Sequence, residues 1–229
     1  MKESLLEISG KFLGGKREAH RAAGMESGGE HLKKYISRME SGEYFQIVFE
    51  KAGADGTLSR VEDNVVIRME PQEINGDAYD LRYKSQKLAD PYYVRVISVD
   101  EENSVVWVSH NRARMEMRPG IEEELNQMLK DKKSGMVRVK GKVMRIQSKT
   151  VEGESVDTGV WLDLCGVGIL GFVYIGDWAQ TFTPMLRGEV SYGDVIEVCV
   201  KERKVKKQKK RDLVYYACSR KELADNPWE

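Results

Sequence analysis

The chain has 229 residues, enough for one large domain or two small ones, and its 41% hydrophobic content can supply a packed core. Its 37 basic and 37 acidic residues cancel, so overall charge gives no argument for a polyanionic partner. No apolar run approaches 18 residues and no signal pattern opens the chain, which excludes a membrane helix and favours a cytoplasmic protein.

Residues 1–41 are rich in Gly, Ser, Glu and Lys, and we expect a flexible segment that contains one short helix. Within residues 31–40, apolar side chains recur on one side of a helix at Leu32, Tyr35, Ile36 and Met39.

Residues 42–115 are predicted to form a first β-barrel. Strand-like runs lie at residues 45–49, 56–61, 64–69 and 92–97. Residues 94–114 are typical of a hairpin that turns at 101–104.

A linker helix is expected within residues 116–134. Pro119-Gly120 would open it, and Gly135 would end it. An apolar stripe follows at Ile121, Leu125, Met128 and Leu129. We expect this stripe to pack on a barrel, and a helix that binds a partner is the alternative.

Residues 135–229 contain the strongest pattern in the chain. The segments MVRVKGKVMRI, TGVWLDLCGVGILGFVYIGDWA, GDVIEVCVKE and DLVYYACSRKEL place apolar residues at every second position. Gly-containing or charged breaks separate them. About five strands in fewer than a hundred residues match a small OB-type barrel, which offers a curved face to a nucleic-acid strand.

The order of these segments resembles the ribosomal protein S-one domain, an OB-fold module that binds RNA. The matching residues are 139–143, 159–164, 171–175, 193–196 and 219–223. In the first half the likeness is degenerate, because residues 77–85 lack the Gly-aromatic core of the third strand. The resemblance implies an all-β protein with linker helices, in which two tandem five-stranded antiparallel OB-fold barrels follow each other. It also makes a bacterial origin plausible.

Strand alternation divides the second barrel's side chains into an inner aliphatic set and an outer set. The outer set contains the aromatic residues Trp161, Phe172 and Tyr174 and the basic residues Arg138, Lys140 and Lys142. Aromatic rings beside cations suit single-stranded RNA, because bases stack on the rings and the cations hold phosphates. In the S-one family the positions of Trp161 and Tyr174 are usually Phe and His, and both face RNA. The family's other stacking position is Thr158 here, which cannot stack.

A basic segment joins the last two predicted strands. It contains Lys204, Lys206, Lys207, Lys209, Lys210 and Arg211, and family members often place an Asp and an Arg in this hairpin instead. We predict that the segment grips RNA phosphates. A solvated hairpin tip is the alternative.

Cys165, Cys199 and Cys218 lie in apolar strand patterns without a C-x-x-C pair, so we expect buried free thiols in a reducing compartment. The three histidines lie in the first half and have no ligand spacing, so neither a metal nor another cofactor is expected. The sequence has no P-loop and no Gly-x-Ser-x-Gly elbow, and we expect no enzymatic activity.

These patterns predict a cytoplasmic, non-enzymatic protein that holds single-stranded RNA on the aromatic and basic face of its second barrel. Two alternatives stay open. OB faces also take single-stranded DNA, which would make the protein an accessory factor in replication or transfer. Aromatic residues are also enriched at protein interfaces, so the barrel could instead be a scaffold that docks a ribosome or a polymerase.

Overall fold

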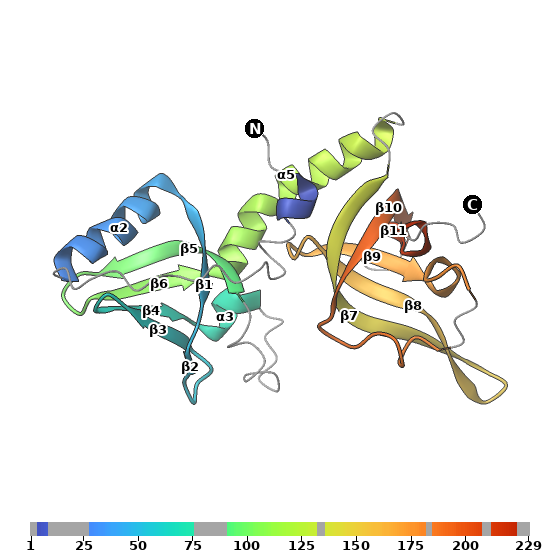
Figure 1. Ribbon diagram of the computed structural model, residues 1–229, viewed down its shortest axis with the longest axis horizontal. Helices are drawn as coiled ribbons and strands as arrows, with labels where there is room; N and C mark the ends of the chain where they lie inside the picture. Colours follow the sequence, from blue (N-terminus) through green and yellow to red (C-terminus); the bar gives the residue numbers. More distant parts are fainter. Residues whose placement is uncertain are drawn as a thin grey trace. The chain divides into compact units, whose positions relative to one another are not determined.

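The computed structural model describes residues 4–8, 28–75, 91–131, 136–181, 185–207 and 212–223 (Figure 1). The chain divides into two compact units. One is Gly14–Glu116, and the other joins Met1–Leu13 to Met117–Glu229. Among the helices in the described ranges, none combines the length and the apolar character that a membrane crossing requires.

The first unit is a six-stranded sheet with the order β1-β5-β6-β4-β3-β2. Its strands are β1 (Tyr44–Val48), β2 (Lys51–Ala52), β3 (Leu58–Glu62), β4 (Val65–Met69), β5 (Pro91–Asp100) and β6 (Val105–Ser109), with helices α2 (Gly28–Ser41) and α3 (Pro71–Asn75). The order differs from the predicted five-stranded antiparallel barrel, because β4 and β6 run parallel and the first strand is broken after Val48. The two pieces of that strand form opposite edges of the sheet, since β1 pairs with β5 and β2 with β3.

The core of this unit follows from strand alternation. In β4, Val65, Ile67 and Met69 are fully buried, whereas Arg68 points outward. Helix α2 lies where the sequence predicted a helix, and it buries Leu32 and Tyr35 in the same core. The segment 77–85 lies outside the described residues.

The second unit is a closed barrel with the strand order β10-β11-β9-β8-β7. Its strands are β7 (Val137–Val151), β8 (Glu154–Leu164), β9 (Ile169–Tyr174), β10 (Val195–Lys206) and β11 (Leu213–Ser219). The short 3-10 helices η3 (Ile175–Asp177) and η4 (Lys221–Leu223) follow β9 and β11. The strand count agrees with the prediction, but the barrel is not wholly antiparallel because β11 pairs with β9 in parallel.

The barrel interior is aliphatic and tightly packed. Val139, Leu162 and Val173 are fully buried, as the alternation predicted. Gly171 faces inward at a point where a Cβ atom would lie 2.6 Å from Cδ2 of Leu164. Only a glycine lets the two strands keep this close packing.

Helix α5 (His110–Lys130) starts earlier than the predicted linker helix. Ser109 caps it, because its Oγ atom accepts a hydrogen bond from the amide of Arg112 at 2.8 Å. Pro119 lies inside the helix and leaves the carbonyl of the exposed Met115 without its intrahelical donor.

The predicted apolar stripe of this helix packs on the second barrel. Ile121 and Leu125 are buried, and Met128 and Leu129 are half-buried. Between them, Asn126 accepts a hydrogen bond of 2.9 Å from the hydroxyl of Tyr216, which lies in β11.

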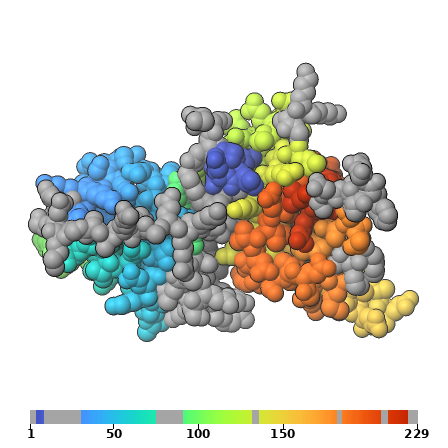
Figure 2. All heavy atoms as spheres, viewed as in Figure 1, coloured from blue at the N-terminus to red at the C-terminus, as the bar shows by residue number. Residues whose placement is uncertain are grey.

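The hairpin of β7 and β8 is longer than predicted, and its tip projects from the barrel (Figures 1 and 2). We expected the two strands to end near residue 146 and to begin near 158. The turn residues Glu152 and Gly153 both have positive φ, of 52° and 89°, as a type I′ hairpin turn requires.

A buried carboxylate holds this hairpin to the loop before β10. Asp157 is 4% exposed and accepts hydrogen bonds from the Ser148 hydroxyl and from the amides of Leu186 and Arg187. The Arg187 Nε atom lies 3.3 Å from the same carboxylate. Burial raises the pKa of Asp157, but these donors and this cation outweigh it and hold the pKa below its usual value.

Candidate nucleic-acid interface

Three aromatic rings from three strands meet on the outer surface of the second barrel. Trp161 of β8 lies 4.7 Å from Phe172 of β9 between ring centroids. Tyr215 of β11 lies 5.4 Å from Trp161 and 6.4 Å from Phe172. All three side chains are half-buried, so each ring keeps part of its surface in solvent. We call Trp161, Phe172 and Tyr215 the aromatic cluster.

Strand register brings these rings together. Trp161 pairs directly with Phe172, and Phe172 pairs with Ala217, two residues after Tyr215. The next strand residues, Leu162 and Val173, turn inward and are fully buried. The predicted outward positions of Trp161 and Phe172 are therefore confirmed.

A glycine makes room for the Phe172 ring. A Cβ atom on Gly159 would lie 2.4 Å from Cζ of Phe172 and 2.5 Å from the carbonyl oxygen of Val173. The ring thus lies over the bare backbone of β8. Any side chain at residue 159 would push it away from Trp161.

The Trp161 ring is also fixed by a polar contact. Its Nε1 atom donates a hydrogen bond of 2.7 Å to Oε1 of Gln147 in β7. Arg145 pairs with Trp161 across the same two strands, and its side chain is exposed. A β-bulge separates Val143 from Arg145 in this register. The bulge puts a cation beside the cluster that strict alternation did not predict.

Tyr174 is the most exposed of the predicted stacking residues, at 55%. It pairs with Gly159 and lies two positions from Phe172 along β9. The predicted outward position of Tyr174 is therefore confirmed, and Tyr174 and Trp161 occupy diagonal positions on adjacent strands. Thr158 is half-buried, and its hydroxyl donates to the carbonyl of Gln147 at 3.0 Å.

All three predicted first-strand cations pair with residues of β10, and Lys142 alone of the three also pairs with β8. Lys142 pairs with Asp163 of β8, two positions from Trp161. Lys140 pairs with Glu197, and Arg138 with Cys199, both in β10. Since β8 ends opposite Gly141, Arg138 and Lys140 lie beyond its end. Only Lys142 reaches the side of the barrel that bears the aromatic cluster.

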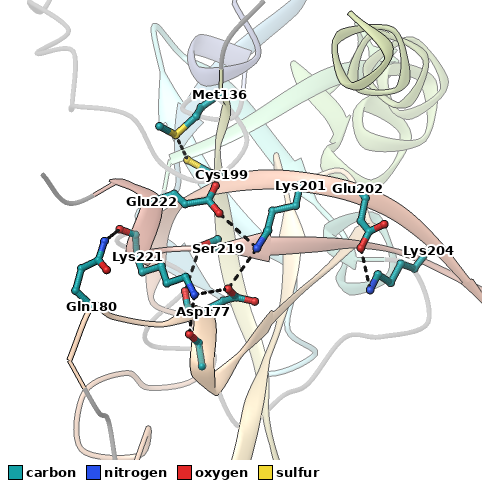
Figure 3. Close-up of polar contacts among 11 residues, drawn as sticks. Met136, Asp177, Gln180, Cys199, Lys201, Glu202, Lys204, Ser219, Lys221 and Glu222 are labelled. Atoms are coloured by element: carbon teal, nitrogen blue, oxygen red, sulfur yellow. Dashed lines mark hydrogen bonds and ion pairs between the residues drawn. The ribbon is translucent and has the colours of Figure 1, made fainter. Parts of the chain in front are cut away.

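The predicted basic hairpin begins on β10. Lys204 pairs with Tyr215, and its Nζ atom lies 2.9 Å from Oε1 of Glu202 (Figure 3). Lys206 pairs with Leu213, and both Lys206 and Lys207 are exposed. Lys209, Lys210 and Arg211 lie outside the described residues.

An ion-pair network fixes the start of this basic hairpin on β10. Lys201 Nζ lies 3.4 Å from both Asp177 Oδ1 and Glu222 Oε1, and Lys221 Nζ lies 3.0 Å from Asp177 Oδ1 (Figure 3). Burial raises the pKa of Asp177, but the two ammonium groups outweigh it and lower the pKa below its usual value. Lys201 therefore joins β10 to η3 and η4.

The cysteines are buried free thiols, as predicted. Burial raises the pKa of Cys165 and of Cys218 to about 12, so neither is a nucleophile at neutral pH. Within the described ranges, no group of three or more His, Cys, Asp or Glu side chains is arranged to hold a metal ion.

No protein-family model and no curated protein matches the sequence. Solved structures give distant likenesses. A chain in the crystal structure of the a/eIF2alpha–aDim2p–rRNA complex from Pyrococcus horikoshii is 20% identical over 38% of this chain, with a TM-score of 0.28. A multidomain protein with nucleic acid binding domains from Streptococcus pneumoniae is 14% identical over 78% of this chain, with a TM-score of 0.31.

The chain spans 44% and 50% of the length of these two proteins.

Proposed function

We propose that this protein binds single-stranded RNA on the outer face of its second barrel, without enzymatic activity of its own. The observation that carries the proposal is the aromatic cluster, in which three rings from three strands keep solvent-facing surface. Stacking of a base on such a ring contributes about 1–3 kcal/mol and tolerates any base.

Cations surround the cluster where phosphates would lie. Arg145 pairs with Trp161, and Lys204 with Tyr215. Lys142 lies two positions farther along the same edge. Phosphate contacts set affinity and orientation but carry no sequence information. We therefore expect binding that depends strongly on salt and weakly on sequence.

We propose further that both units are OB folds, the second of the S-one type. The strand order of the barrel, with its third and fifth strands paired in parallel, supports this assignment. The first sheet supports it as well, because its broken first strand contributes both edges and β4 pairs with β6 in parallel. A cytoplasmic protein of bacterial origin fits the same family.

A competition experiment tests the function. A labelled single-stranded RNA of mixed sequence is bound at low salt and displaced by unlabelled RNA or by DNA of the same sequence. We expect RNA to compete better, through contacts to the 2′-hydroxyl. Equal competition by DNA would assign the face to single strands of either kind. No binding of either polymer would refute the proposal and favour a protein partner for the aromatic cluster.

A further inference from the structure

A groove runs between the last turns of α5 and strand β10, within the second unit. It has a volume of about 450 Å³ and is lined by Asn126, Leu129, Lys130, Lys201, Glu202 and Arg203. It contains none of the residues of the aromatic cluster. Three of its six lining residues are basic and one is acidic.

The groove is bordered by an open strand edge. Strand β10 pairs with β7 only as far as Val200, whereas its pairing with β11 continues to Lys206. From Lys201 to Lys206, β10 therefore has one neighbouring strand within the described residues. The side chains of residues 201–206 are exposed, and the groove lies along the start of this edge.

Residues 201–206 of β10 and 213–217 of β11 form a two-stranded arm, and its two faces border different surfaces. Lys204 pairs with Tyr215, so it lies on the face of the aromatic cluster. Arg203 pairs with Tyr216, the residue whose hydroxyl binds Asn126 of α5, so it lies on the groove side. The groove and the aromatic cluster are therefore the two sides of one two-stranded arm, separated by the open edge of β10.

Some of the charged side chains around the groove are already held in ion pairs, and others are not. Lys201 is held by Asp177 and Glu222, and Glu202 by Lys204. Among the described residues, neither Lys130 nor Arg203 is part of an ion pair, and both side chains are exposed. Arg203 also interacts with the side chain of Tyr216, and its remaining donors can bind a ligand. The two groove cations without an acidic partner among the described residues thus lie on opposite walls, one on the helix and one on the strand.

Charged side chains on an edge strand can also serve only to prevent edge-to-edge pairing between copies. That role accounts for lysines along β10. It does not account for Lys130, which lies on α5 across the groove from Arg203.

We propose that the strand that stacks on the aromatic cluster crosses the open edge of β10 and continues in this groove. There Lys130 and Arg203 bind its phosphates. This inference rests on the proposed function and extends it, because it defines a second, purely electrostatic part of the path. Short oligonucleotides occupy the aromatic cluster alone, and longer ones fill both parts.

The test compares strand lengths. Single-stranded RNAs of about 4 and about 16 nucleotides, which bracket the range of OB-fold sites, are titrated against the full chain at several salt concentrations. The double variant Lys130→Gln/Arg203→Gln is compared with Lys33→Gln/Lys51→Gln, which removes the same charge from exposed positions of the first unit.

For the longer RNA, we expect the groove variant to make the log–log salt slope shallower by about 1.4, since each lost contact on a single strand contributes about 0.7. For the shorter RNA, the slope and affinity stay within twofold of the wild type. The control variant leaves both lengths unchanged. Arg203→Lys, which keeps the charge, retains the wild-type slope.

A loss that is equal at both lengths, or no loss at the longer length, overturns the groove path while the aromatic cluster stands. If the wild type binds neither RNA, the proposed function and this inference both fall. Lys130→Glu guards against misfolding, because its side chain is exposed at the end of α5. It must reproduce the length-dependent loss while still unfolding cooperatively in urea, at a midpoint lowered only slightly because an acid at the end of α5 opposes the helix dipole.

Discussion

Replacing Trp161 with Ala should weaken binding of single-stranded RNA. The variant removes the central ring of the aromatic cluster, which lies within 5.4 Å of the other two ring centroids. A lost stacking platform costs about 1–3 kcal/mol per base. At about 1.4 kcal/mol per tenfold change in Kd, the expected loss of affinity is roughly 5-fold to 150-fold.

The variant Trp161→Phe separates stacking from the polar contact. Phenylalanine keeps an aromatic face but loses the hydrogen bond from Nε1 to Gln147. A neutral hydrogen bond contributes about 1 kcal/mol net, which appears mainly in the free energy of unfolding. We therefore expect Trp161→Phe to bind RNA within a few-fold of the wild type and to unfold at a slightly lower urea concentration.

Fluorescence anisotropy of a labelled 16-nucleotide RNA measures both variants. Trp107→Ala is the matched control, because Trp107 is also a half-buried strand tryptophan and has the Arg68 guanidinium 5.7 Å from its ring. It lies in the first unit, so its loss should leave the affinity unchanged.

Two results would refute the reasoning. If Trp161→Ala binds as the wild type does, the cluster is not the stacking surface. If Trp107→Ala loses as much affinity as Trp161→Ala, the effect does not belong to the second barrel.

Three further changes test the structure itself. Gly159→Ala should lower the free energy of unfolding by about 1–3 kcal/mol in urea, because the added methyl group collides with Phe172; unchanged stability would contradict the close approach. The pKa of Asp157 is lowered by its donors in the fold, so its carboxylate stabilises the protein above about pH 4, the unfolded value, and this contribution is lost as pH falls through the folded value. Asp157→Asn should therefore be less stable than the wild type at pH 7, with a difference that shrinks on acidification; a difference independent of pH would contradict this. Because burial raises the pKa of Cys165 and Cys218 to about 12, iodoacetamide at pH 8 should label them only after denaturation, and rapid labelling of the native protein, read by mass spectrometry, would disprove their burial.

Strand alternation predicted the inside and outside of β8 and β9 correctly, because it depends only on the backbone pleat. Leu162 and Val173 fill the core, and Trp161 and Phe172 face outward. Alternation fails where the phase changes. The bulge between Val143 and Arg145 shifts the register of β7, so alternation alone does not predict that Arg145 lies beside the aromatic cluster.

Tyr215 was missed for a different reason. It stands next to Tyr216 in a strand where both alternate sets contain aromatic or small residues, so the period does not show which tyrosine is inside. In the structure Tyr216 is 1% exposed and bonded to Asn126, and Tyr215 faces outward. Asn126 on α5 determines which of the two tyrosines faces inward, and the sequence of β11 alone does not reveal this contact.

The sequence analysis placed the start of α5 too late and made the β7–β8 hairpin too short. Pro119-Gly120 is typical of a helix start, yet α5 begins earlier, at the Ser109 cap. The helix tolerates Pro119 in its interior because solvent can hydrogen-bond to the carbonyl that the proline leaves without a donor. The outer part of the hairpin has no buried face, as residues 149–156 are exposed throughout. Without a buried face, the sequence shows no alternation there.

The parallel pairing of β9 with β11 also has a consequence for synthesis. Strand β11 is the last strand of the barrel in the chain, yet it lies between β9 and β10. Until residues 213–219 have left the ribosome, β9 and β10 have no shared neighbour and the barrel remains an open sheet. Tyr215 is therefore the last part of the aromatic cluster to be made, and the nascent chain acquires its three-ring surface only when the barrel closes.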